Sequence, residues 1–337
     1  MRILYYLPYV NGLGADYWIY HGWKHAFEDL NHDFATATAE DDLRLRVEEF
    51  KPDIFLVANL GNILLSDSDN MEWMRKKGVK VFLIVYWPLR PKEVEILINK
   101  DVADVYYGER EPESMHDFTR VTGRQYHLIP QAANRMWHFP TELSKEHEYD
   151  ILYIGAKLAK KRQMFEEILL PLRKKYRVGI FGPYWTASDN VLRVCQKICR
   201  NAGFQNGADS INRIRFKRVI PSIETQRKLF ASSRISLNFH EREPDGSQPH
   251  YILTQRTFVV PACGGFEICD YVPALRKYFA EDEMVMAKDK NDWFEKIDYY
   301  LAHDDERRQI QLKGSQRALK DHTYHNRVEQ VIDLYRG

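Results

Sequence analysis

The sequence has no long apolar runs. No stretch approaches the roughly 18 consecutive apolar residues that a membrane-spanning helix needs. The first residues read MRILYYLPYVNGLGADYW, with one Arg, a short apolar stretch and no cleavage site of the signal-peptide kind. RILYYLP is more typical of a buried first strand. We therefore expect a cytoplasmic protein without a membrane span.

Cysteine is scarce, with four residues in the whole chain. Cys195 and Cys199 are four residues apart on an expected helix, a spacing that is common in helix packing. Neither this pair nor Cys263 and Cys269 has His or Cys neighbours at the spacing of a zinc site. We also find no Asp-x-Asp pair suited to a divalent cation, so we expect no metal and no other cofactor.

Two phosphate-binding signatures are absent as well. Gly12 and Gly14 follow the first strand, but Tyr17 stands where the dinucleotide fingerprint requires a third Gly. A Walker loop is not found either. These absences argue against a nicotinamide-dependent oxidoreductase. Gly12 and Gly14 fit a plain loop, or a loop that brings the backbone close to a phosphate at a helix start.

What the sequence does contain is a regular alternation. Charged residues make up 29% and apolar residues 44% of the 337-residue chain, enough for two globular cores. Short apolar runs alternate with longer helical patterns, which predicts parallel sheets built from βαβ units. The expected strands are 2–8, 33–37, 53–58, 80–86, 103–107 and 126–129, then 150–157, 177–182, 214–219, 234–239, 264–268 and 283–287. We predict an α/β protein with two doubly wound, Rossmann-like domains, residues 1–130 and 150–321, joined by the connection 131–149 and facing a cleft.

Positive charge is concentrated in one segment. The whole chain has a formal net charge of +1, whereas residues 157–218 contain fifteen Lys or Arg and four acidic residues. Such a block is usually a solvated face, and it can also bind phosphates or a polyanion.

Two segments of the second domain have residues suited to a diphosphate. After Gly155, Lys161 and Arg162 fall at a helix start, where cations oppose the helix dipole unless an anion lies among them. Further on, an expected strand ends at Asn238, and a helix from about His250 carries Arg256. The expected donor-binding residues are Gly12, Gly14, Gly155, Lys161, Arg162, Gly182, Asn238, His250, Arg256, Gly264 and Gly265.

The stretches LTQRTFVVPACGGFEICDYVPALRKYF and WFEKIDYYLAHDDERRQIQLKGSQRALKDHTYHNRVEQVIDLY resemble the CgeB-like glycosyltransferases of the group 1 glycosyltransferase clan. RISLNFHER, IFGPYW and LIPQAAN are similar to landmarks of the same family. The resemblance implies a GT-B fold whose second domain binds a nucleotide-sugar, with a C-terminal helix, 322–337, that crosses back to the first domain. It also implies that Lys161 and Arg162 face the diphosphate and that Gly264 and Gly265 form a return loop.

One position departs from the family. Val259 stands where the family has a Glu after Arg-x-Phe, and in the wider clan that carboxylate binds the ribose hydroxyls. Either another group binds the ribose, or the protein uses an unusual donor, or it has lost donor binding.

We therefore predict a metal-independent glycosyltransferase. The resemblance to the clan implies that the anomeric configuration is retained and that no dedicated base is needed; otherwise Asp16 or His21 of the first domain would deprotonate the acceptor. The candidate catalytic residues are Asp16, His21 and His240. The nucleotide-sugar is a co-substrate, and the acceptor is a small molecule, a polysaccharide, a protein side chain or duplex DNA. The two alternatives are a phage-type enzyme that glycosylates hydroxymethylated bases in DNA and a non-catalytic protein that keeps the fold.

Overall fold

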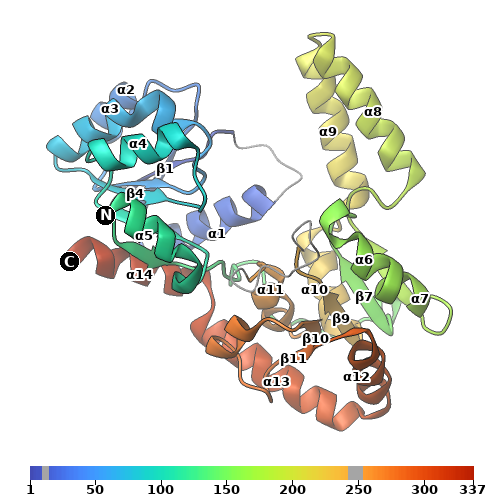
Figure 1. The fold of residues 1–337 in the computed structure, drawn as a ribbon. Coiled ribbons are helices and arrows are strands. Elements are labelled where there is room, and N and C mark those ends of the chain that lie inside the picture. The colour runs from blue at the N-terminus through green and yellow to red at the C-terminus, as the bar shows by residue number, and fades with distance from the viewer. Residues whose placement is uncertain (10–14, 242–252) are drawn as a thin grey trace. The chain divides into compact units, whose positions relative to one another are not determined.

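The computed structural model of the protein describes residues 1–9, 15–241 and 253–337. They form two compact units (Figure 1). The first unit holds Met1–Asn134 together with Tyr324–Gly337, and the second holds most of Arg135–Thr323.

The first unit is built on a six-stranded, all-parallel sheet with the order β2-β1-β3-β4-β5-β6. Its strands are β1 (Arg2–Tyr6), β2 (Asp33–Ala37), β3 (Ile54–Val57), β4 (Lys80–Ile84), β5 (Val105–Gly108) and β6 (Tyr126–Leu128). Its helices are α1 (Ala15–Asp29), α2 (Leu43–Phe50), α3 (Ile63–Lys76), α4 (Pro91–Asn99), α5 (His116–Thr122) and α14 (Tyr324–Arg336). The central strand β3 is buried along its whole length, as expected for a parallel strand that is covered on both faces.

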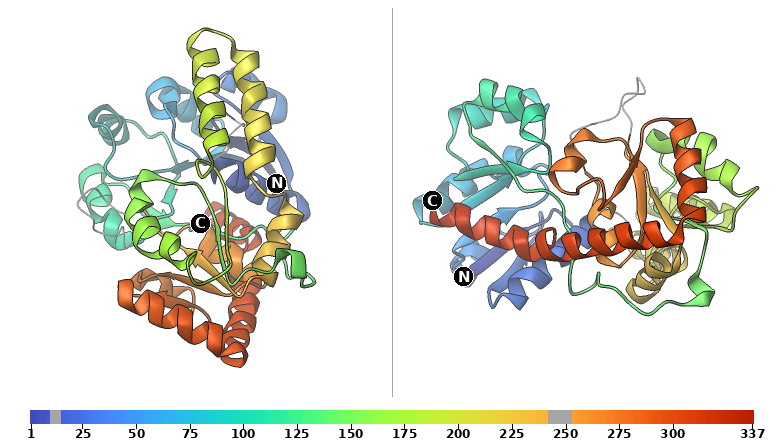
Figure 2. Two further views of the ribbon diagram at one scale, coloured as in Figure 1. Left: turned by 90° about the vertical axis from the view of Figure 1, so that its right-hand side faces the viewer. Right: turned by 90° about the horizontal axis from the view of Figure 1, so that it is seen from below.

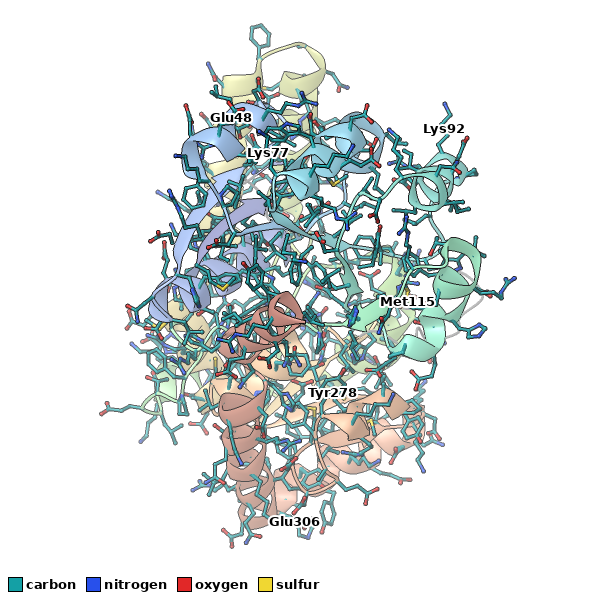
Figure 3. The ribbon with its side chains drawn as sticks, turned by 90° about the vertical axis from the view of Figure 1, so that its left-hand side faces the viewer. Glu48, Lys77, Lys92, Met115, Tyr278 and Glu306 are labelled. Atoms are coloured by element: carbon teal, nitrogen blue, oxygen red, sulfur yellow. The ribbon has the colours of Figure 1, made fainter. Side chains whose placement is uncertain are left out.

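The surface of the first unit is charged and its interior is apolar. Glu48, Lys77 and Lys92 are exposed on or next to the helices that cover the sheet, whereas Met115 is buried (Figure 3). This division lets the helices cover the sheet with their apolar sides while their charged sides remain in water.

The C-terminal helix α14 belongs to the first unit and packs against α1. Tyr324 lies against Gly22, where any side chain would collide with its ring, and 5.5 Å from the ring of Trp23. His325 Nε2 lies 2.9 Å from an Asp29 carboxylate oxygen. These contacts attach the last residues of the chain to the first helix of the unit.

The second unit contains a five-stranded parallel sheet with the order β11-β10-β9-β7-β8. Its strands are β7 (Ile151–Ile154), β8 (Val178–Phe181), β9 (Ile235–Asn238), β10 (Glu267–Asp270) and β11 (Val285–Ala287). Its helices are α6 (Arg162–Met164), which continues through Leu169 into α7 (Leu170–Leu172), and then α8 (Ala187–Asn201), α9 (Gln205–Val219), α10 (Ile223–Ser232), α11 (Arg256–Ala262), α12 (Lys290–Ala302) and α13 (Asp304–Asp321). The expected fold class, α/β with two Rossmann-like parallel-sheet domains, is confirmed.

One predicted strand is wrong. Residues 214–219 lie in α9, which pairs with α8 as a helical hairpin that projects from the sheet of the second unit (Figures 1 and 2). Arg215 Nε donates to Asp189 at 2.8 Å, and Arg215 Nη1 donates to Gln196 at 2.8 Å, with all three side chains buried between the helices. The alternation of apolar and charged residues predicts a strand here, but the segment is a helix whose position depends on a buried ion pair with a residue far away in the sequence. A local sequence pattern does not reveal such a pair.

None of the helices in the described ranges is both long and apolar enough to cross a bilayer.

Candidate active site

The candidate site lies at the carboxyl ends of β7, β9 and β10, which are neighbours in the second sheet. Ligands of open parallel sheets bind beyond these ends, where the following loops converge. Polar side chains gather here from the end of β10, the start of α11 and the segments that follow β7 and β9: Asp270, Arg256, Lys161, His240 and Glu241.

Lys161 is a buried cation. It ends a short 3-10 helix (Ala159–Lys161) after β7, and only 3% of its surface is exposed. Burial and then the charge of Arg256 lower the pKa of Lys161 to about 7, while Glu241 and Asp270 act in the opposite direction. A lysine that lies among charged groups and is close to neutrality is prepared to gain a proton when an anion arrives.

Arg256, the first residue of α11, has a fixed position. Its Nη1 donates to the carbonyl of Ile154 at 2.7 Å, and its guanidinium lies 5.2 Å from the centre of the Tyr153 ring. Gly155 makes room for it, because a side chain there would collide with Arg256 Nη1. Gly182 has a φ of +128° and in turn lies against the backbone of Gly155, so both glycines are needed for close approach.

His240 and Asp270 form a buried pair at the same edge. The backbone N–H of His240 donates to Asp270 Oδ2 at 2.5 Å, and His240 Nδ1 lies 3.3 Å from the same oxygen. Both side chains are almost completely buried. Within the described ranges, His240 Nε2 and Asp270 Oδ1 have no hydrogen-bond partner, so they keep hydrogen-bonding capacity for a ligand or a neighbouring loop.

Asn238 connects the strands to α11. Its amide donates to Thr257 at 3.1 Å and to Glu267 at 2.9 Å, and Thr254 donates to its carbonyl oxygen at 3.1 Å. Burial raises the pKa of Glu267 to about 8, so this carboxyl carries a proton at neutral pH. The network fixes the start of α11, and with it Arg256.

Three other expected donor residues have structural partners. Arg162 turns away from the sheet edge, with 75% of its side chain exposed, and donates to Glu166 at 2.7 Å. Gly264, with a φ of +73°, packs on Pro140, and Gly265 lies against the Phe230 carbonyl. Gly12, Gly14 and His250 lie outside the described residues.

Val259 faces an apolar cluster. Its side chain is 5% exposed and packs with Leu152, Val260 and Cys263. No carboxylate is available at this position for a ribose.

The first unit places its own polar groups at the carboxyl edge of its sheet. Asp16 lies in the first turn of α1 and accepts a 3.5 Å hydrogen bond from the Asn59 amide. Burial and the neighbouring charges of His25 and Lys24 lower the pKa of His21 to about 4. His21 is therefore neutral at pH 7 and a weaker base than an ordinary histidine, which does not favour it as the group that deprotonates an acceptor.

Glu109 is a polar residue that the sequence analysis missed. It follows β5 directly, and Gln131 donates to its carboxylate at 2.9 Å. Burial raises the pKa of Glu109 to about 7, a suitable value for a group that exchanges protons near neutral pH. The only signal in the sequence is its position directly after an apolar strand, since no motif surrounds it.

A hollow of the first unit lies at the opposite edge of its sheet. This hollow of about 440 Å³ is lined by charged side chains that pair with one another, Arg75 with Asp104 at 3.1 Å and Arg124 with Asp101 at 3.1 Å. Its position at the amino ends of the strands and its compensated charge do not suit a nucleotide.

Across residues 1–9, 15–241 and 253–337, no group of three or more His, Cys, Asp or Glu side chains is placed to hold a metal ion. Asp67 and Asp69 form an Asp-x-Asp sequence, but they lie on α3, where Asp67 accepts from Asn70 and Asp69 pairs with Lys100.

Comparison with known proteins gives the family. The sequence matches the glycosyl transferase-like family over residues 161–333, just over half of the chain. No curated protein matches the sequence.

Several solved structures share the fold over the whole chain. Sucrose-phosphate synthase from Thermosynechococcus elongatus has a TM-score of 0.63 at 12% identity, covering 99% of this chain and 98% of its own. Anabaena HepE in complex with UDP-glucose has a TM-score of 0.62 at 11% identity, with coverages of 99% and 98%. An alpha-glucosyltransferase in complex with UDP and a 13-mer DNA containing an HMU base has a TM-score of 0.65 at 10% identity and covers both chains fully. These likenesses show a common GT-B fold, and the chain belongs to the glycosyl transferase-like family.

Proposed function

We propose that this protein transfers a sugar from a nucleotide-sugar and that Lys161 and Arg256 bind the donor diphosphate. The observation that carries the proposal is the buried Lys161 next to Arg256 at the carboxyl edge of the second sheet. Two cations at this edge compensate the negative charge of a diphosphate and of the leaving nucleotide. The bond between the anomeric carbon and the β-phosphate oxygen breaks, and the acceptor oxygen forms the new bond.

The donor that we would test first is UDP-glucose. HepE has been solved with UDP-glucose, and the alpha-glucosyltransferase has been solved with UDP. The CgeB-like subtype also belongs to the proposal, supported by the Ala-Cys-Gly-Gly-Phe sequence that ends at Phe266.

Retention of the anomeric configuration and independence of metal complete the proposal. When the acceptor attacks from the side that the diphosphate leaves, the leaving phosphate oxygen can take the acceptor proton. Lys161 and Arg256 supply positive charge that a metal would otherwise provide. Activity is expected to survive EDTA, and loss of activity that a divalent ion restores would overturn this part.

If the reaction inverts the configuration, a base must take the acceptor proton. Glu109, with a pKa of about 7, and Asp16 are then the groups to test in the first unit. Product stereochemistry by NMR distinguishes the two routes. A retained configuration together with an active Glu109→Gln variant supports the route without a base.

The experiment compares two neighbouring lysines. Lys161→Met should weaken UDP-glucose binding by about 10- to 150-fold, the range for a lost charge-assisted hydrogen bond. Lys160→Met is the matched control, because Lys160 is exposed and pairs with Glu241 at 3.6 Å. Equal effects of the two changes on binding measured by calorimetry would contradict the assignment. Binding without turnover, across a panel of acceptors, would favour the non-catalytic alternative.

A DNA acceptor is the second candidate function. Two observations favour it: the excess of basic residues between Lys157 and Arg218, and the structural likeness to an enzyme solved with DNA that contains an HMU base. The test offers duplexes with hydroxymethylated bases and a panel of nucleotide-sugars, and it weighs the nucleosides by mass spectrometry. A hexose or pentose increment supports DNA. Donor hydrolysis without an increment points to a small molecule, a polysaccharide or a protein side chain.

A further inference from the structure

His240 and Asp270 are two buried polar residues at the carboxyl edge of the second sheet. Asp270 is the last residue of β10, and His240 follows β9, the neighbouring strand (Figure 1). Each residue is only 1% exposed. In the part of the chain that the structure describes, neither ring nitrogen of His240 makes a hydrogen bond, and nor does Asp270 Oδ1. Buried polar atoms are almost always hydrogen-bonded in native proteins, so exceptions that gather at one edge of a sheet indicate a ligand site.

The two residues hold one another in place. The backbone N–H of His240 donates to Asp270 Oδ2 at 2.5 Å, and His240 Nδ1 lies 3.3 Å from that same oxygen. Oδ2 is therefore occupied, and Oδ1 is the oxygen that can accept a hydrogen bond from a ligand. A carboxylate that is buried and held by a backbone N–H is already ordered before the ligand arrives, so binding costs little additional entropy.

The pair lies beside the cations that we assign to the diphosphate. Burial and the charge of Arg256 lower the pKa of Lys161, whereas the charges of Glu241 and Asp270 raise it. Arg256 and Asp270 are therefore both within electrostatic reach of the same buried lysine. A nucleotide-sugar whose diphosphate is bound by Lys161 and Arg256 has the groups next to its phosphates close to Asp270.

The charge of Asp270 decides which part of the donor it can contact. A carboxylate accepts hydrogen bonds and repels a phosphate, so Asp270 Oδ1 suits a hydroxyl group and not the diphosphate itself. In a nucleotide-sugar, the two groups attached directly to the diphosphate are the transferred sugar and the ribose, and both have adjacent hydroxyl groups. The imidazole of His240 can donate to a second hydroxyl or accept from it.

We propose that Asp270 and His240 bind adjacent hydroxyl groups of the donor, on the transferred sugar or on the ribose. The inference rests on the proposed function, because it takes the diphosphate to lie against Lys161 and Arg256. If the hydroxyls belong to the transferred sugar, Asp270 contributes to the choice of sugar. If they belong to the ribose, Asp270 replaces the carboxylate that is lacking at Val259.

The test measures by calorimetry how Asp270→Asn changes the dissociation constants of UDP-glucose, UDP and 2′,3′-dideoxy-UDP. Asparagine keeps the shape of the side chain and an oxygen for the N–H of His240, but its amide group donates where Asp270 Oδ1 accepts. UDP-glucose should bind about 10- to 150-fold more weakly, beyond any change for dideoxy-UDP, which has no ribose hydroxyls. All three ligands contain the diphosphate, so an effect of the lost charge on Lys161 cancels from the comparison. If another nucleotide-sugar binds more tightly, that donor and its own nucleotides replace the uridine set.

The response of UDP separates the two sources of the hydroxyls. If they are on the transferred sugar, UDP should respond like dideoxy-UDP, and one deoxyglucose analogue of UDP-glucose should respond no more than UDP does. If they are on the ribose, UDP should lose as much affinity as UDP-glucose.

Two further variants accompany Asp270→Asn. His240→Phe keeps a ring of similar volume and should give the same pattern with about a 2- to 12-fold loss, the range for a neutral hydrogen bond. Asp282→Asn is the control, because the Asp282 side chain is 61% exposed and pairs with Lys313. This variant should bind all three ligands like the wild type.

Equal changes for all three ligands would overturn the inference, because they would show that Asp270 acts through the fold or through the diphosphate. The proposed function would survive that result if Lys161→Met weakens the binding of all three ligands. A wild-type protein that binds none of them, and no other nucleotide-sugar of a panel, would overturn both. If circular dichroism shows that Asp270→Asn does not fold, His240→Phe decides the question by the same comparison.

Discussion

Donor binding should take up a proton on Lys161. In the free protein the pKa of this lysine is lowered to about 7 by burial and by Arg256. About half of the molecules are then neutral at Lys161 at pH 7, and about nine-tenths at pH 8. A diphosphate next to Lys161 favours the charged form and raises its pKa. Binding at pH 8 should therefore take up close to one proton, and binding at pH 7 about half a proton.

Calorimetry in buffers of different ionisation enthalpy measures this uptake. UDP-glucose is the better ligand, because UDP has a terminal phosphate that itself titrates near pH 6. Above pH 7 the dissociation constant should rise by up to about tenfold per pH unit, since a proton must be bound together with the donor.

Three variants test whether the proton goes to Lys161. Lys161→Arg keeps a permanent charge, so its proton uptake should vanish while donor binding persists. Lys161→Met should lose both the uptake and much of the affinity. Lys160→Met should behave like the wild type. Tight donor binding by the wild-type protein at pH 8 without proton uptake would refute the reasoning.

Three further predictions concern other buried groups. The pKa of Glu267 is raised to about 8, so its contribution to stability is complete below about pH 4.5 and is lost as the pH rises toward 8. Between these pH values the free energy of unfolding of the wild type should fall by about 1.4 kcal/mol per pH unit through this group, and that of Glu267→Gln should not. Identical urea midpoints for both proteins from pH 5 to 8 would contradict this. Gly155→Ala should displace Arg256 and weaken UDP-glucose binding by about 1.5 kcal/mol, whereas an unchanged dissociation constant would show that Arg256 does not contact the donor. Arg215→Met leaves Asp189 buried without its partner and should destabilise the hairpin by about 3–5 kcal/mol. The loss should be seen as fast amide hydrogen exchange in α8 and α9. If the buried charge is the cause, adding Asp189→Leu to the Arg215→Met variant should restore most of the protection from exchange.

Most of the fold could be predicted from local pattern. Buried parallel strands are continuous apolar runs, and β1, β3, β4 and β7 all fall within predicted strands. The hairpin could not be predicted in this way, because its pairing depends on Asp189 and Arg215, which are 26 residues apart. The residues around Arg215 alternate between apolar and charged side chains, and this local pattern alone predicts a strand.

The candidate site was only partly predictable. In a parallel sheet the segments that follow the strands all lie at the carboxyl edge of the sheet. The sequence therefore predicts that Gly155, His240 and Arg256 lie near one another at that edge. Which of two adjacent cations turns inward depends on the phase of a single helical turn. Lys161 is buried and Arg162 is exposed, although both follow the same strand. Glu109 was missed because a single acidic residue after a strand has no motif around it.

The absence of a carboxylate at position 259 changes what donor affinity depends on. A carboxylate that accepts from ribose hydroxyls contributes about 1.5–3 kcal/mol through a charge-assisted hydrogen bond, at a distance from the reacting phosphates. Val259 contributes none, since it packs into an apolar cluster. If no other group takes over, the donor is bound mainly through its diphosphate and therefore through Lys161 and Arg256. Affinity should then be more sensitive to pH, and less selective for the nucleoside, than in a relative that has the carboxylate. Comparing UDP-glucose with other nucleotide-glucose donors at pH 7 and pH 8 tests both consequences together. Strong discrimination between nucleosides would show that another residue has taken over the recognition of the ribose and base.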